Sequence, residues 1–94
     1  MEKTTILTKS GNKTLILPAY YKDTEYEDSL YLYKVYNRDG ELVCLRIKII
    51  HIDNFFSAEL STTSVSIAIN YKESNVLEWT SGLGKVSELL TNHI

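Results

Sequence analysis

The chain has 94 residues, of which 44% are hydrophobic and 23% are charged. These fractions are typical of a globular domain and exclude a chain too polar to fold, while the length allows one hydrophobic core. The net charge of -2, with dispersed basic residues, argues against a protein that binds phosphate backbones. We therefore expect a single domain over residues 1–94 that does not bind nucleic acid directly.

Cys44 is the only cysteine, which excludes an intrachain disulfide and a paired-cysteine zinc site. The N-terminal residues carry an early acid and only a short apolar run, which is unlike a secretory signal. No apolar run reaches the roughly 18 residues that cross a bilayer. These features predict a cytoplasmic protein with no membrane partner.

The beginning of the chain predicts a β-hairpin. Residues 4–9 and 14–20 are rich in β-formers, and residues 10–13 between them include a Gly-Asn pair suited to a tight turn. Pro18 lacks an N–H group, so the second strand is expected to end there or to lie at a sheet edge. The acidic run over residues 22–29 then predicts a loop.

The middle of the chain predicts a second hairpin. Residues 30–36 and 41–52 read as strands joined by Asp39-Gly40, a dipeptide typical of hairpin turns. In the longer strand, apolar residues occupy both faces near His51. This pattern predicts a bulge or a second buried layer there.

The remaining elements are two strands and a helix. Residues 55–60 predict a short strand, residues 61–64 a polar break, and residues 65–71 a half-buried strand in which apolar and small or polar residues alternate. From residue 76 apolar residues recur every three or four positions, as in an amphipathic helix. Its expected apolar stripe is Val76, Trp79, Leu83, Val86, Leu89 and Leu90.

Two further features bear on this helix. Asn75 and Glu78 resemble a capping box at its start. Gly82 and Gly84 predict a kink or two short helices as readily as one long helix, or a close approach of the helix to the sheet. The expected fold class is α+β: a mostly antiparallel sheet of about six strands in a meander of hairpins, with the C-terminal amphipathic helix packed on one face.

The segment from Tyr20 to Tyr36 contains six of the seven tyrosines, interspersed with four carboxylates. Tyrosine is favoured at protein interfaces, and clustered carboxylates attract basic surfaces. Strand alternation places Tyr31 and Tyr33 on one face and Tyr36 on the other, so the tyrosines cannot all serve one surface. The residues predicted to contact a partner are Asp23, Glu25, Tyr26, Glu27, Asp28, Tyr31 and Tyr33.

No residue pattern predicts catalysis, a metal site or a cofactor. Cys44 and His51 would be about 23 Å apart in one strand, and Cys44 lies in an apolar run typical of a core. His51 and Asp53 share a strand face, and His93 is the one further histidine, but two or three scattered ligands do not define a zinc site. The segment 81–84 is glycine-rich but lacks the spacing of known phosphate-binding loops.

These observations predict a non-enzymatic protein-binding module. A small acidic inhibitor that occupies the basic groove of a nucleic-acid-handling protein has this character, as phage anti-defence proteins such as anti-CRISPR proteins do. One alternative is a small-molecule binding protein, with a pocket at a subunit interface or between sheet and helix that is lined by Tyr31, Tyr33 and Trp79. Another is a structural subunit that uses an exposed strand edge. Homo-oligomerisation is compatible with each.

Overall fold

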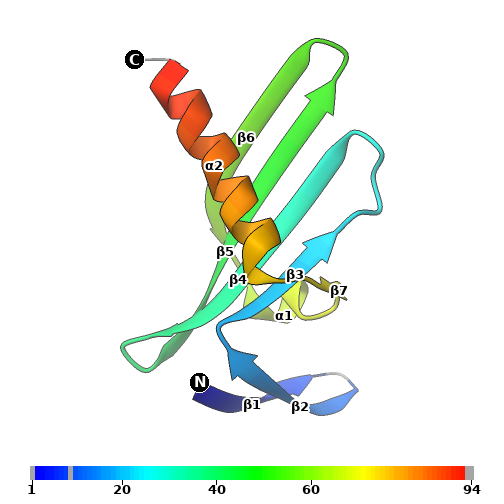
Figure 1. Cartoon of the computed structure of the whole chain (residues 1–94). Coiled ribbons are helices and arrows are strands. Elements are labelled where there is room, and N and C mark those ends of the chain that lie inside the picture. The colour runs from blue at the N-terminus through cyan, green and yellow to red at the C-terminus, as the bar shows by residue number, and fades with distance from the viewer. Residues whose placement is uncertain (1, 9, 93–94) are drawn as a thin grey trace.

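The computed structural model describes residues 2–8 and 10–92, which form a sheet with a helix packed across it (Figure 1). The described strands make a two-stranded sheet of order β1-β2 and a five-stranded sheet of order β6-β5-β4-β3-β7. The predicted α+β class, with a mostly antiparallel sheet and a C-terminal helix on one face, is confirmed. The elements are β1 Glu2–Thr8, β2 Gly11–Leu17, β3 Ala19–Asp23, β4 Ser29–Arg38, β5 Glu41–Ile52, β6 Phe55–Thr63, α1 Val65–Ala68, β7 Lys72–Glu73 and α2 Val76–Asn92.

The predicted first hairpin is present as β1 and β2, which are paired from Glu2–Leu17 to Thr8–Gly11. Lys9, which was assigned to the first strand, lies outside the described residues. β2 ends before Pro18, as expected for a residue that cannot donate a ladder bond. The chain then enters β3, which was not predicted: its first residues were assigned to the preceding strand and its last to the acidic loop.

Strands β4, β5 and β6 form an antiparallel meander in continuous register. The turn between β4 and β5 is at Asp39-Gly40, where both residues have positive φ (53° and 89°). This turn was predicted correctly. No bulge interrupts β5 in the described register, so the first of the two alternatives expected near His51 is absent.

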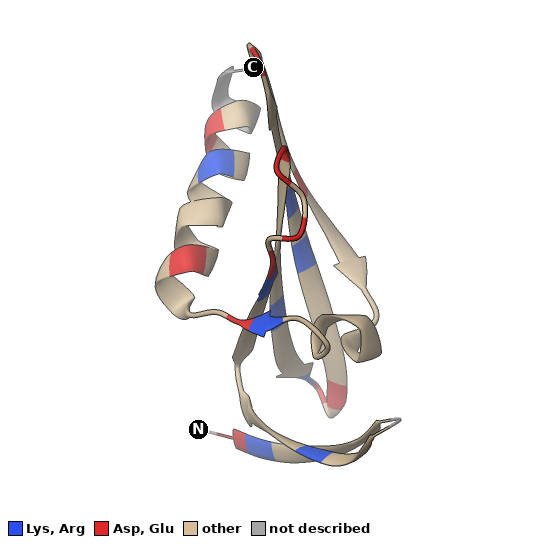
Figure 2. Cartoon of the chain, turned by 90° about the vertical axis from the view of Figure 1, so that its right-hand side faces the viewer, with Lys and Arg blue, Asp and Glu red and all other residues tan. Residues whose placement is uncertain are grey.

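Side chains that alternate along the central strands enter two different cores on opposite faces of the five-stranded sheet. On one face, Leu32 and Ile47 pack beneath Trp79 of α2. On the other, Val35 and Cys44 pack against β2 and α1. Figure 2 views the sheet edge-on, with α2 on one side and α1 on the other. Two buried layers explain the apolar residues on both faces of β5 around Cys44 and Ile47. Nearer His51, Ile50 is half-buried, Ile52 is 44% exposed and neither belongs to the described cores, so the second layer does not reach that end of the strand.

The segment 65–71, predicted as a strand, contains helix α1 instead. Val65, Ala68 and Ile69 all contribute to the core on that face of the sheet. These residues are three and four positions apart, which places them on one side of a helical turn. The alternation of apolar residues in the same segment fits a strand equally well. β6 continues to Thr63, so the first three residues of the predicted break at 61–64 belong to the edge strand, and Ser64 precedes α1 as its N-cap residue. The tertiary contacts, which the local pattern does not contain, decide between the two readings.

α2 is one continuous helix. The backbone N–H of Glu78 donates to Asn75 Oδ1 at 2.9 Å, which is the predicted N-terminal cap. Lys22 of β3 forms an ion pair with Glu78 at 3.1 Å, which fixes the first turn to the sheet. The hydrogen bond from Lys22 is the largest of several effects that hold the pKa of Glu78 below its usual value.

The helix face that meets the sheet is rotated from the expected apolar stripe. Trp79 and Gly82 are buried, whereas Val76 and Leu83 are exposed. A Cβ atom at Gly82 would lie 2.6 Å from Leu32 Cδ1, so this glycine permits the close approach that was one of the predicted roles. Gly84 has open space around it and produces no break in the helix.

Candidate functional site

The loop of residues 24–28 joins β3 to β4 at one end of the sheet and is anchored on both sides. The N–H of Glu25 donates to Asp23 Oδ1 at 3.0 Å, a local turn typical of aspartate. At the other side, the N–H of His51 donates to the carbonyl of Asp28 at 2.9 Å. The loop between these bonds is exposed, and Figure 2 shows its acidic residues facing the viewer.

The four predicted carboxylates divide into one structural and three exposed groups. Asp23 is only 7% exposed and uses its side chain to shape the loop, so we assign it a structural role. Glu25, Glu27 and Asp28 are exposed. Among the described residues, none of these three forms an ion pair, so their charges face solvent.

Tyr26 is the exposed aromatic residue of this loop, with 57% of its surface accessible. Its ring meets the ring of Tyr31 edge-on, with 6.3 Å between the ring centroids. Tyr31 is half-buried, and the charged groups of Arg46 and Lys48 lie 5.8 and 6.0 Å from its ring centroid. The loop therefore presents its acids beside an aromatic and basic patch on the same end of the sheet.

Tyr33 is not available to a partner in this structure. It is 3% exposed and stacks on Tyr71, with 5.2 Å between centroids and 15° between ring planes. Burial, followed by the neighbouring Tyr71 hydroxyl, raises the pKa of Tyr33 far above its usual value. We therefore assign Tyr33 to the core. Strand alternation places it on the same face as Tyr31, but nearer the centre of the sheet, where β2 and α1 cover it.

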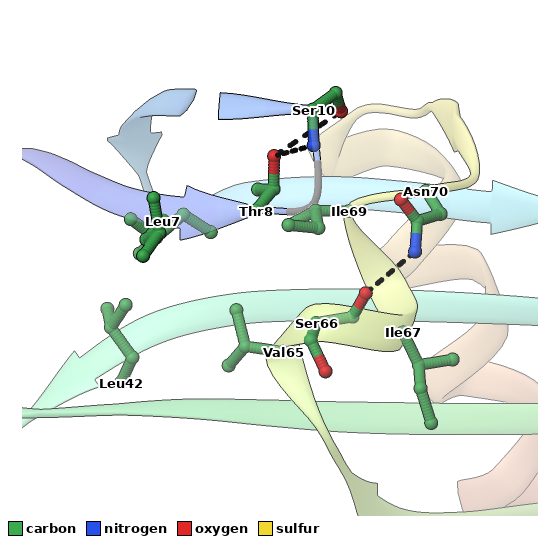
Figure 3. A pocket seen from close by; sticks show the side chains of 10 residues that line it. Leu7, Thr8, Ser10, Leu42, Val65, Ser66, Ile67, Ile69 and Asn70 are labelled. Carbon is green, nitrogen blue, oxygen red and sulfur yellow. Dashed lines mark hydrogen bonds between the residues drawn. The ribbon is translucent and has the colours of Figure 1, made fainter. Parts of the chain in front are cut away.

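Tyr31, Tyr33 and Trp79 do not line a common pocket between the sheet and the helix of one chain, because Trp79 lies on the opposite face of the sheet. A different cavity, of about 750 Å³, lies between the N-terminal hairpin and α1. Figure 3 shows aliphatic side chains from both elements and from β5 around it, with hydroxyl and amide groups also in its lining. Its lining residues are Ile6, Leu7, Thr8, Ser10, Leu42, Val65, Ser66, Ile67, Ile69 and Asn70.

This cavity is apolar and open to solvent. Leu7 and Ile67, on its two sides, are both exposed. Asn70 Nδ2 donates to the carbonyl of Ser66 at 2.8 Å, so this amide is used in the turn that ends α1. Among the residues that the structure describes, no acidic or basic side chain lines the cavity. Sequence reasoning missed it because residues 65–71 were assigned to a strand, which would not face the hairpin in this way.

The other residues considered for chemistry are dispersed. Cys44 is a buried free thiol, and burial raises its pKa to about 11, as expected for a core cysteine. His51 is exposed and contacts the ring of Phe56. His93 lies outside the described residues. Segment 81–84 is inside α2 rather than at its start, so its N–H groups are not presented to a phosphate.

Neither a cluster of metal ligands nor a membrane-spanning helix is found among the described residues. No group of three or more potential metal ligands occurs there, and no described helix is long and apolar enough to span a membrane. Comparisons with models of protein families, with curated proteins and with solved structures found no match. Function therefore has to be argued from the surfaces themselves.

Proposed function

We propose that the protein is a non-enzymatic binding module whose 24–28 loop docks into a basic groove of a partner protein. The observation that carries the proposal is the combination of three exposed, unpaired carboxylates with exposed Tyr26 on a loop anchored at both sides. Charged groups that complement a partner accelerate association and exclude wrong partners. Tyrosine supplies contact area at low entropic cost.

The partner class that fits this surface is a protein with a groove for a nucleic-acid backbone. The carboxylates of Glu25, Glu27 and Asp28 would take the positions of phosphates, and Tyr26 would fill a neighbouring pocket. The protein would then act as an inhibitor by occupying the groove, as a small anti-defence protein does. Arg46 and Lys48, which lie near the ring of Tyr31, would sit beside the docked loop.

The test is a quantitative capture experiment from host lysate with the variant E25Q/E27Q/D28N. A matched control, D39N/E41Q/E88Q, makes the same change in net charge at exposed acids outside the loop. We expect a partner that binds the wild-type chain and the control, is lost with the loop variant, and is displaced by an added oligonucleotide. Equal capture by the loop variant and the control would refute the proposal.

A second candidate function is favoured by the cavity of about 750 Å³, which falls in the size range of small-molecule sites. Its apolar lining suits an apolar ligand. Mass spectrometry of the protein after denaturation would detect a co-purified molecule. The variant Ser66→Trp, which places an indole at the lining of the cavity, should abolish that signal while leaving partner capture by the loop intact; retention of the molecule would exclude this cavity as its site.

A further inference from the structure

The outer edge of β6 is unprotected. Among the described strands, β6 is the terminal strand of the five-stranded sheet and pairs with β5 alone. Exposed edges are usually blunted by lysine, proline, a bulge or short length. β6 has nine residues, Phe55–Thr63, in continuous register, with no proline and with Glu59 as its one charge. Such an edge can accept another strand.

The register identifies which backbone groups point outward from this edge. The N–H of His51 donates to Asp28 on the β4 side, so alternate residues of β5 from His51 backwards bond to β4. The intervening residues of β5 direct their backbone N–H and C=O groups to β6, where their partners are Phe55, Ser57, Glu59 and Ser61. The N–H and C=O groups of Phe56, Ala58 and Leu60 therefore face away from the sheet.

The side chains of these same residues form an apolar strip beside α2. Phe56, Ala58 and Leu60 lie on the α2 face, and together with Val86 and Leu89 of the helix they line a groove of about 560 Å³. Leu60 is 45% exposed. Phe55, which precedes Phe56 and lies on the opposite face of the strand, is 61% exposed. Free hydrogen-bonding groups and apolar side chains thus coincide along one edge.

We propose that β6 pairs with β6 of a second copy of this chain, antiparallel about a two-fold axis at Ala58, to form one continuous sheet. In this register Ala58 lies opposite Ala58, and Phe56 lies opposite Leu60 in both directions. The residues in these pairs are the ones whose backbone N–H and C=O groups point away from the sheet, so the two residues of each pair exchange two backbone hydrogen bonds. On the other face, Ser57 lies opposite Glu59, a hydroxyl donor opposite a carboxylate. Both α2 helices lie on the same face of the joined sheet.

The neighbouring registers fit less well. Opposed side chains must lie on the same face, so the axis has to pass beside one residue of β6. An axis at Glu59 places two carboxylates directly opposite each other, which is destabilising. An axis at Leu60 places Ala58 opposite Thr62 and Phe56 opposite Ser64. An axis at Ser57 places Phe56 opposite Ala58 but leaves Leu60 opposite Asn54. The axis at Ala58 is the one that pairs Phe56, Ala58 and Leu60 entirely with one another while separating the two glutamates, and this self-complementarity identifies a second copy as the partner.

The first test measures the oligomeric state of the full chain by sedimentation velocity from micromolar to millimolar concentration. We expect a concentration-dependent equilibrium between monomer and dimer. Ala58→Pro removes an N–H that points outward and so leaves the pairing with β5 intact. This variant should be monomeric with an unchanged circular dichroism spectrum. A wild-type chain that is monomeric throughout, or a folded Ala58→Pro variant that dimerises as well as wild type, would overturn the proposal.

A second pair of variants tests the register and does not depend on whether Ala58→Pro folds. Ser57→Glu places a carboxylate opposite Glu59 at two symmetric positions and should weaken dimerisation by about tenfold or more, whereas Ser57→Lys should strengthen it. The controls Asn12→Glu and Asn12→Lys make the same charge changes on the exposed hairpin and should behave alike. If the two Ser57 variants dimerise equally, the register at Ala58 is wrong.

Discussion

Replacing Gly82 by alanine should destabilise the protein relative to the same replacement at Gly84. Both glycines lie inside α2, so each substitution gains about 1 kcal/mol of helix propensity. Their surroundings differ. At Gly82 the new methyl group would lie 2.6 Å from Leu32 Cδ1 and 3.3 Å from Ile47 Cδ1, whereas at Gly84 nothing lies within 4 Å.

The magnitude follows from this contrast. Leu32 and Ile47 are buried in the core, so neither can rotate into solvent to relieve the contact. Overpacking a core costs about 1–3 kcal/mol. Gly84→Ala should therefore raise the free energy of unfolding by about 1 kcal/mol, and Gly82→Ala should leave it about unchanged or lower it by up to about 2 kcal/mol. The difference between the variants is the overpacking cost.

Equilibrium unfolding in urea, followed by fluorescence, measures both variants. Trp79 is the single tryptophan and is buried between α2 and the sheet, so its emission reports directly on this contact. In thermal melts, a change of 1 kcal/mol in the free energy of unfolding corresponds to a shift of about 4–8 °C in Tm for a domain of this size. If Gly82→Ala proves as stable as Gly84→Ala, the close approach of α2 to the sheet is not as described.

Three further predictions concern individual groups. Asn75→Ala removes the cap of α2 and should lower the free energy of unfolding by about 1 kcal/mol in urea titrations, whereas Asn75→Ser should preserve most of it. Burial raises the pKa of Cys44 from 9.0 to about 11. The stability that its neutral thiol contributes is therefore complete below pH 9 and is lost as the pH rises towards 11. Cys44→Ala should reduce the fall in Tm over this pH range in thermal melts. The pKa of Glu78 is lowered, so its effect on stability runs the other way with pH. The stability that its carboxylate contributes is present above about pH 4.5 and is lost on acidification, so Glu78→Gln should reduce the fall in Tm at low pH.

The hairpins and the helix could be predicted from the sequence because their signals are local. The Asp39-Gly40 turn, the strand alternation that follows it and the Asn75 cap each depend on residues close together in the chain. The hairpin and capping rules apply directly to such patterns. These features account for the correct fold class.

The errors occurred where distant contacts decide. Segment 65–71 fits a strand and a helical turn equally well by spacing, and its packing against Cys44 and the N-terminal hairpin selects the helix. The apolar stripe of α2 was placed on Leu83 rather than Gly82, because a glycine contributes nothing to a hydrophobic pattern even when it is the residue in contact. β3 was missed because its charged residues are typical of a loop.

The candidate loop was only partly predictable for the same reason. Sequence identified the acidic, tyrosine-rich segment, and strand alternation correctly placed Tyr31 and Tyr33 on one face. Alternation gives the face but not what covers it. β2 and α1 cover Tyr33 and leave Tyr31 only half-buried, and these elements come from distant parts of the chain.

The two cores on opposite faces of the sheet have a consequence for how the molecule opens. Leu32 and Ile47 pack in one core, and Tyr33 and Cys44, from the same two strands, pack in the other, so β4 and β5 form the common wall of both cores. Peeling away α2 or the N-terminal hairpin alone would leave these two strands paired and covered on one side. The backbone amides at their centre should therefore exchange with solvent hydrogen only through global unfolding, while those of β7 and α1 exchange through local opening.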